Sequence, residues 1–196
     1  MNNIYNLTEE KGILVAAHRG VAGANIPCNT IPAFDIALKE GADILEMDLI
    51  RTIDGEIFIF HAGKEPFQLD RHINLHRITA KEVRNLKLVN VDFAETEWGL
   101  NTFDEILEHY KGKCILNLDK SIDILDSIVE KVNKHNMQDQ ILLKSDPDMK
   151  SLKMIENYAS DYMYMPILKN IDNGTEIIES MNINYIGAEL VFSSED

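Results

Sequence analysis

The chain has 196 residues, with 19 Lys or Arg against 33 Asp or Glu, and its formal net charge is −14. This length suits one domain with a sizeable core, and we expect a single domain over residues 1–196. Nucleic-acid-binding proteins normally offer a basic face to the phosphates, so the acidic balance argues against that class and against docking on anionic lipid. A small anionic substrate would need a local positive centre, such as a divalent cation.

The amino-terminal residues and the cysteines bear on where the protein works. Residues 1–12 lack the basic segment and the long apolar run of a signal peptide. No apolar run approaches the length that spans a bilayer. Cys28 and Cys114 fit no zinc-binding spacing, and we interpret them as two free thiols. These features predict a cytoplasmic protein without a membrane span.

The first expected elements are a strand and a helix. Residues 13–17 form a short continuous apolar run, which is typical of a strand buried on both faces. A helix is predicted from Thr30, which can cap it, with Pro32 in its first turn and Gly41 at its end.

Two strand-like runs follow at residues 44–50 and 56–60, and Asp54-Gly55 between them is a turn signal. Only seven residues separate Asp48 from Glu56, too few for a crossover helix. Local features therefore indicate a hairpin at this point.

The remaining elements alternate in type. Capping-box spacing at Thr79/Glu82 and at Thr102/Glu105 predicts a helix start at each site. Further strands are expected at 114–118, 141–144, 162–165 and 183–190, and helices at 121–135, from 146–147 onward and at 176–182. Such alternation favours a parallel α/β sheet, either doubly wound or closed into a barrel. Seven strands are expected where a (β/α)₈ barrel has eight, so the sheet is open or its last βα unit is missing.

Three carboxylates follow or lie within the expected strands. Glu46 and Asp48 alternate with apolar residues, so both point to the same side of one strand. Two carboxylates so close repel each other and need a cation or a proton. Oxygen ligands suit Mg²⁺ or Ca²⁺, and Asp119, at the end of a later strand, is a candidate third ligand. The ordinary alternative is that Glu46 and Asp48 face solvent beside a turn.

Nitrogen-bearing side chains lie at the same strand ends. His18 and His61 would flank the carboxylates, and one imidazole could take a proton from the attacking hydroxyl while the other protonates the leaving alcohol. Arg19 offers a planar fork to a phosphate, and Lys120 could contact phosphate or pair with Asp119. Singly, each residue also has an ordinary structural explanation, as a hydrogen-bonding histidine or a surface ion pair.

The order and spacing of these pieces resemble the glycerophosphodiester phosphodiesterase family, within the PLC-like phosphodiesterase superfamily. The similarity rests on His18-Arg19-Gly20, Asn29-Thr30, Gly41-Ala42-Asp43, Glu46-x-Asp48, Thr52-x-Asp54-Gly55 and His61, with Asn117-Leu118-Asp119 later. It is specific over residues 13–61, weaker to about residue 120 and vague afterwards.

This resemblance implies a TIM-like (β/α) barrel and the hydrolysis of glycerophosphodiesters to glycerol 3-phosphate and an alcohol, a reaction of lipid metabolism. It implies one divalent cation, Mg or Ca, held by Glu46, Asp48 and Asp119. By the same carry-over, His18 and His61 are the acid/base pair. Arg19 and Lys120 are phosphate contacts, and the partner is a small-molecule phosphodiester.

Several positions depart from the family pattern. Cys28 stands where the family usually has Glu, and Ala62 follows His61 where Asp is usual. Asp119 replaces a longer Glu, and Lys120 follows it by one place instead of two, which would turn Lys120 to the opposite face of the strand. Nothing after Asp196 supplies the family's eighth strand, so we expect a fragment with an incomplete barrel and pocket.

Three other hypotheses stay open. A lyase-type phosphodiesterase acting on choline- or inositol-bearing lipids would also use two histidines and a cation, but would accumulate a cyclic phosphate. A non-catalytic barrel could retain metal or phosphate affinity without turnover. An ordinary α/β domain with coincidental matches is the third.

Overall fold

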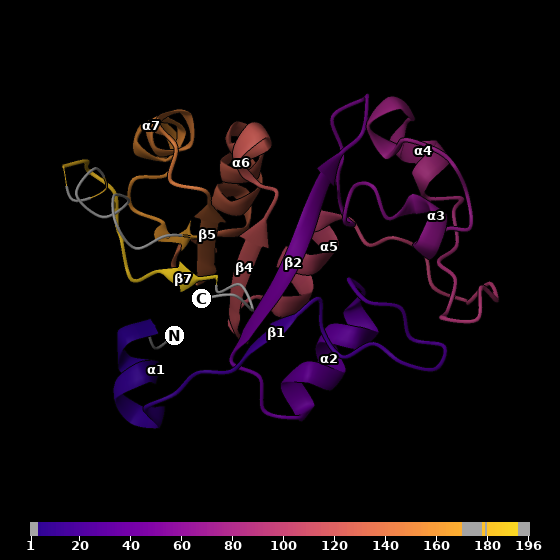
Figure 1. Cartoon of the computed structure of the whole chain (residues 1–196), viewed down its shortest axis with the longest axis horizontal. Coiled ribbons are helices and arrows are strands. Elements are labelled where there is room, and N and C mark those ends of the chain that lie inside the picture. The colour runs from indigo at the N-terminus through magenta and orange to yellow at the C-terminus, as the bar shows by residue number, and fades with distance from the viewer. Residues whose placement is uncertain (1–3, 170–177, 179, 192–196) are drawn as a thin grey trace.

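A computed structural model describes residues 4–169, 178 and 180–191 (Figure 1). Among these residues, six strands form one parallel sheet in the order β1-β2-β4-β5-β6-β7. The six strands are β1 (Ala16–His18), β2 (Ile44–Arg51), β4 (Ile115–Asp119), β5 (Ile141–Ser145), β6 (Met163–Leu168) and β7 (Glu189–Leu190). This curved, open sheet confirms the expected incomplete TIM-like barrel.

Four helices form the outer layer beside the sheet: α2 (Ile31–Lys39), α5 (Phe103–Tyr110), α6 (Leu125–His135) and α7 (Met149–Tyr158). Two short helices, α3 (Glu65–Gln68) and α4 (Ala80–Val83), lie in the long segment between strand β3 (Ile57–Ile59) and α5. Single 3₁₀ turns occur at Leu75–Arg77, Ile122–Ile124 and Gln138–Gln140. None of the helices in the described part of the chain has the length and apolar character needed to cross a membrane.

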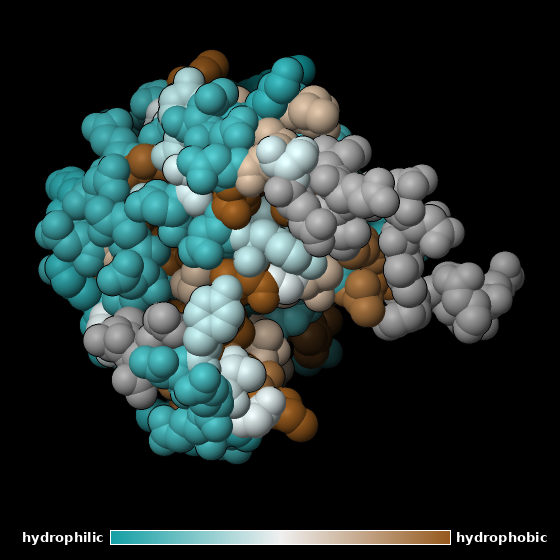
Figure 2. Space-filling view, turned by 90° about the vertical axis from the view of Figure 1, so that its left-hand side faces the viewer, coloured by the Kyte–Doolittle hydropathy of each residue, from teal (hydrophilic) through white to brown (hydrophobic). Residues whose placement is uncertain are grey.

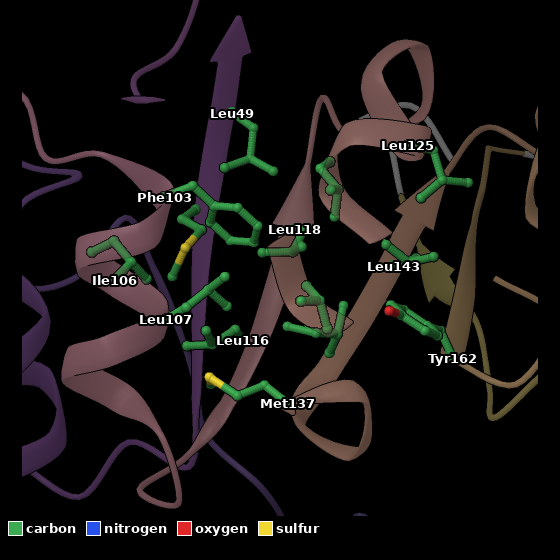
Figure 3. Close-up of a cluster of buried hydrophobic side chains, with 14 of the residues drawn as sticks. Leu49, Phe103, Ile106, Leu107, Leu116, Leu118, Leu125, Met137, Leu143 and Tyr162 are labelled. Carbon is green, nitrogen blue, oxygen red and sulfur yellow. The ribbon is translucent and has the colours of Figure 1, made fainter. Parts of the chain in front are cut away.

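The main core lies between the sheet and this outer layer. Alternate side chains of β2, including Leu45, Met47 and Leu49, point outward and are buried against the helices. Leu116, Leu118 and Leu143 continue the same surface on β4 and β5, and Phe103, Ile106, Leu107 and Leu125 cover it from α5 and α6 (Figure 3). Because side chains alternate along a strand, the residues between them must point to the concave, inner face of the sheet.

The inner face is layered from apolar to charged along the strands. Ile44, Ile115, Leu142 and Met163 form an apolar layer at the amino-terminal end of the sheet. Helix α1 (Ile4–Lys11), which we did not predict from the sequence, packs Ile4 and Leu7 on this layer. Lys11 forms an ion pair with Asp43, which directly precedes β2, and this contact holds α1 against the amino-terminal end of the sheet. Glu46 on β2, Asn117 on β4 and Lys144 on β5 are polar side chains at the next inner positions toward the carboxyl ends of these strands.

The expectation that residues 13–17 are buried on both faces is wrong. Strand β1 is shorter and later, and the side chains of Ile13 and Val15 are 80% and 54% exposed. Among the described residues β1 pairs with β2 alone, so it is an edge strand, and one of its sides lacks a neighbour to bury it.

The hairpin indicated by the short connection after β2 is confirmed. Strand β3 (Ile57–Ile59) runs antiparallel to β2 and pairs Leu49 with Ile59. It therefore lies off the path of the parallel sheet, which holds six of the seven strands that we expected.

Most of the later elements follow the sequence prediction. Both capping boxes are present, at Thr79/Glu82 and at Thr102/Glu105. Helix α7 begins slightly later than predicted, because Asp148 caps it instead of the residues at 146–147. Of the helix expected at 176–182, Ile178 is helical, residues 180–182 form a turn and a bend, and the other three positions lie outside the described residues. The strand expected at 183–190 is reduced to β7 and one bridge between Tyr164 and Tyr185.

The exterior on the side of α7 and β7 is mainly polar. Figure 2, which looks at the left-hand side of Figure 1, shows hydrophilic side chains over most of this face with small apolar areas between them.

Candidate active site

Three carboxylates converge on the inner face. The β2–β4 register places Asp48 opposite Asp119, and Glu46 lies two residues earlier on the same side of β2. One oxygen from each of Glu46, Asp48 and Asp119 lies within 4.8 Å of the others. Glu46 and Asp48 are almost completely buried, with 3% and 0% of their surface exposed.

Three buried oxygens of this cluster accept no hydrogen bond from the described residues: Glu46 Oε1, Glu46 Oε2 and Asp48 Oδ1. A buried carboxylate oxygen without a partner is costly, so the cluster needs a positive charge at this position. Carboxylate oxygens are the ligands that Mg²⁺ and Ca²⁺ prefer, and the three residues therefore fit the divalent cation expected from the sequence.

The two predicted histidines lie beside the cluster, each near a different carboxylate. His18 ends β1, and its Nε2 lies 3.8 Å from Glu46 Oε2. His61 follows β3, and its Nε2 lies 3.9 Å from Asp48 Oδ1. The His18 side chain is more exposed than that of His61, 68% against 24%.

A backbone oxygen orients His61. Its Nδ1 lies 2.8 Å from the carbonyl oxygen of Ala62. Because a carbonyl only accepts hydrogen bonds, Nδ1 carries a proton, so in the neutral form of the ring the lone pair lies on Nε2, which faces Asp48. Ala62 thus supplies an orienting group even though the carboxylate usual in the family is absent at this position.

Arg19 and Asn29 fix Asp48 from the loop after β1. Arg19 Nε lies 2.8 Å from Asp48 Oδ2, and the Asn29 side-chain amide donates to the same oxygen over 2.9 Å. Both residues have left-handed backbone angles. The backbone N–H of Asn29 donates to the backbone carbonyl of Arg19, so the loop folds back over the site. Asn29 belongs to the motif we recognised, but sequence reasoning gave it no role.

The lysine nearest the carboxylates is one that we did not select. Lys144, at the end of β5, has its ammonium 3.0 Å from Glu46 Oε1, and its side chain is 8% exposed. Burial alone would lower the pKa of Lys144, but Glu46, with Asp119 and Glu189, outweighs it and holds that pKa above its ordinary value. A lysine closing an otherwise apolar strand was the signal that could have identified it.

Lys120 lies at the margin of the site. Its side chain is 54% exposed, and its ammonium is 3.7 Å from Asp119 Oδ2. A left-handed backbone angle at Lys120 turns the chain away just after β4. Its predicted contact with phosphate therefore stays a prediction.

A cavity of about 420 Å³ opens beside the cluster. Asp119, Lys144 and Ser145 lie on its wall, together with Lys120 and Ala62. This volume suits a small molecule, and Asp119 and Lys144 are the groups of the site that line it.

Comparisons with known proteins agree with this arrangement. The model of the "Glycerophosphoryl diester phosphodiesterase family" matches residues 18–194. A glycerophosphodiester phosphodiesterase of Caldanaerobacter subterraneus subsp. tengcongensis is 28% identical over 145 residues, covering 67% of this chain and 57% of that protein. One from Bacillus subtilis is 41% identical over 69 residues, covering 35% of this chain and 22% of that protein. The matched part of the chain thus spans 57% of the length of the first relative and 22% of the second.

Solved structures share the fold. A glycerophosphoryl diester phosphodiesterase from Parabacteroides distasonis superposes with a TM-score of 0.80 at 18% identity, covering 95% of this chain and 68% of that one. An Oleispira antarctica phosphodiesterase, solved with its product sn-glycerol-3-phosphate, superposes with a TM-score of 0.73 at 21% identity. The match covers 91% of this chain and 74% of that one.

Proposed function

The chain belongs to the glycerophosphoryl diester phosphodiesterase family, and on that premise we propose that it hydrolyses small glycerophosphodiesters to glycerol 3-phosphate and an alcohol. The observation that carries this proposal is the cluster of Glu46, Asp48 and Asp119 with two imidazoles beside it. The Oleispira neighbour, solved with sn-glycerol-3-phosphate, supports the choice of product.

Glu46, Asp48 and Asp119 would hold one Mg²⁺ or Ca²⁺, which supplies positive charge to the phosphate when bound. The oxygens of Glu46 and Asp48 that lack partners support this role. Arg19 and Asn29 hold Asp48 from its other side, so the carboxylate is fixed before any ligand arrives. Asp119 would complete the set from β4.

His61 is the better candidate for the general base. Its Nδ1–H is engaged by the Ala62 carbonyl, so Nε2 is free to take a proton from the attacking hydroxyl. The oxygen of the neighbouring glycerol hydroxyl would then bond to phosphorus as the bond from phosphorus to the alcohol oxygen breaks, and a proton from His18 would neutralise the departing alkoxide, leaving a cyclic phosphate. Water would next open the ring, giving its proton to His18 while His61 returns its proton to the glycerol oxygen, and glycerol 3-phosphate results. The more exposed His18 ring suits exchange of that proton with solvent.

The charges of the site match a phosphodiester. Three carboxylates carry one more negative charge than a divalent cation supplies, and Arg19 restores neutrality. Lys144 and the proton that His18 would donate add two positive charges, and Glu189, which pairs with Lys144, removes one, so one positive charge is left. A phosphodiester is a monoanion, so the site would be neutral with substrate bound.

The experiment measures glycerol 3-phosphate release from glycerophosphocholine and glycerophosphoethanolamine with Mg²⁺, with Ca²⁺ and with EDTA. We expect cation-dependent release that falls by at least about a hundredfold in His18→Ala and in Glu46→Ala. His109→Ala is the matched control, because His109 pairs with Asp35 at the outer helices. No release with either cation would contradict the proposal. A cyclic phosphate that accumulates would favour a lyase.

A further inference from the structure

One buried lysine ties together three strands on the inner face. Lys144 extends from β5, and its ammonium lies 3.0 Å from Glu46 Oε1 on β2 and 3.5 Å from Glu189 Oε2 on β7. Its side chain is 8% exposed, whereas that of Glu189 is 35% exposed. The contact therefore joins the middle of the open sheet to one of its edges.

An ordinary structural lysine in the same protein looks similar but lies elsewhere. Lys131 on α6 also bridges two carboxylates, Glu56 and Asp104, at the outer surface of the fold. Lys144 differs because it lies on the wall of the 420 Å³ cavity beside Asp119. A stabilising ion pair alone does not require that position.

The ammonium of Lys144 also has donor capacity to spare. A lysine has three N–H donors, and the two carboxylate neighbours account for two of them. The third can serve an oxygen in the adjoining cavity. Lys120, the other lysine on that wall, is half exposed and offers a less ordered donor.

We propose that Lys144 binds a non-bridging oxygen of the substrate phosphate, and that Glu189 is a positioning residue that holds the Lys144 ammonium toward the cavity. This proposal rests on the function proposed above. It assigns to β5 the phosphate contact that the sequence suggested for Lys120. It also gives β7, at the edge of the sheet, a part in the site.

The test is calorimetric binding of glycerol 3-phosphate in the presence of Mg²⁺ to Lys144→Met, Lys144→Arg, Glu189→Gln and Lys131→Met. Loss of a charge-assisted hydrogen bond predicts about tenfold or weaker binding in Lys144→Met. Lys144→Arg restores part of the affinity, because the positive charge is kept. We expect Glu189→Gln to weaken binding by about threefold, since only the orientation of the ammonium is lost.

Two further readouts separate this role from a structural one. Mg²⁺ should bind Lys144→Met at least as tightly as the unaltered protein, because an ammonium no longer competes for Glu46. Lys131→Met should lower the melting temperature and leave glycerol 3-phosphate affinity unchanged.

Several outcomes would overturn the proposal. They are unaltered glycerol 3-phosphate affinity in folded Lys144→Met, a larger loss in Lys120→Met than in Lys144→Met, and failure of the unaltered protein to bind glycerol 3-phosphate with Mg²⁺. Each leaves the proposed hydrolysis separately measurable, because substrate turnover is assayed without reference to product binding.

Discussion

Asp48 is the residue on which the site is assembled. It is fully buried, and it receives Arg19 and Asn29 on one oxygen while its other oxygen faces His61. Fixed groups of this kind cost little reorganisation when a charged ligand arrives. The loop after β1 and the hairpin after β2 therefore meet on a single carboxylate.

Cys28, next to this assembly, should be an unreactive thiol. Burial raises the pKa of Cys28 and outweighs the opposing effect of Arg19. The thiolate is the nucleophile, and a raised pKa leaves less of it at any pH below that value. Iodoacetamide at about pH 8 should therefore modify Cys28 more slowly than a free cysteine.

The measurement is made on Cys114→Ser, in which Cys28 is the one remaining cysteine that iodoacetamide can modify. Unfolding in urea should raise the modification rate of Cys28 to that of a free cysteine. Burial raises the pKa of the Cys114 thiol to about 12, so the replaced residue is itself inert in the folded protein. Rapid labelling of Cys28 in the folded state would mean that the loop after β1 opens readily.

At the scale of elements, the junction between β1 and α2 depends on the absence of a side chain at Gly20. Its φ is +75°, and a Cβ there would lie 2.7 Å from the Ala33 carbonyl carbon and 2.9 Å from the Phe34 nitrogen. Both contacts are with backbone that cannot swing aside. The close approach lets the first turn of α2 lie under the loop that carries Arg19.

Gly20→Ala should accordingly cost much more stability than Gly112→Ala. Gly112 has the same φ of +75°, but a Cβ there would meet nothing within 4 Å, so only backbone strain of about 1–2 kcal/mol applies. We expect Gly20→Ala to lower the free energy of unfolding in urea by at least about 2 kcal/mol more. Equal losses in the two variants would show that the loop moves to accept a methyl group.

Helices α5 and α6 are clamped by a charged group outside the site. Asp104 pairs with Lys131 and accepts from His135 Nε2 at 2.8 Å. Burial alone would raise the pKa of Asp104, but the hydrogen bonds from Lys131 and His135 outweigh it and leave that pKa below its ordinary value. The folded protein therefore binds the Asp104 proton less readily than the unfolded chain does.

This depressed pKa has a definite consequence for stability. The contribution of ionised Asp104 to the free energy of unfolding is fully present above the pKa of an aspartate in the unfolded chain, about 3.9. It is lost as the pH falls through the lower pKa of Asp104 in the folded protein. In urea unfolding between about pH 3 and 6, Asp104→Asn should lose stability at the upper end and show a shallower fall at the lower end. An unchanged slope would assign the acid sensitivity to other carboxylates.

At the scale of the whole molecule, the features that could be predicted from the sequence are those that depend on residues close together in the chain. Strand β2, both capping boxes and the hairpin at Asp54-Gly55 follow from spacing within a few residues. The carboxylate cluster could also be predicted, because parallel strands end at one face of a sheet.

What escaped prediction depends on contacts between distant elements. Lys144 reaches Glu46 across the inner face, and no spacing within β5 discloses this contact. Helix α1 has weak amphipathic character and is held by Lys11 and by the apolar layer beneath the strands. The exposure of Val15 likewise follows from the position of β1 at an edge, which its own apolar composition does not reveal.

The open sheet should show in the exchange of its amide hydrogens. Among the described residues β1 pairs only with β2 and β7 only with β6, whereas β4 lies between β2 and β5. Hydrogen–deuterium exchange followed by mass spectrometry should find β1 and β7 exchanging fastest and β4 and β5 slowest, because edge strands open by local fluctuations. Protection of β1 equal to that of β4 would mean that another strand covers its outer edge in solution. Loss of that protection on dilution would identify the covering strand as part of a second copy of the chain.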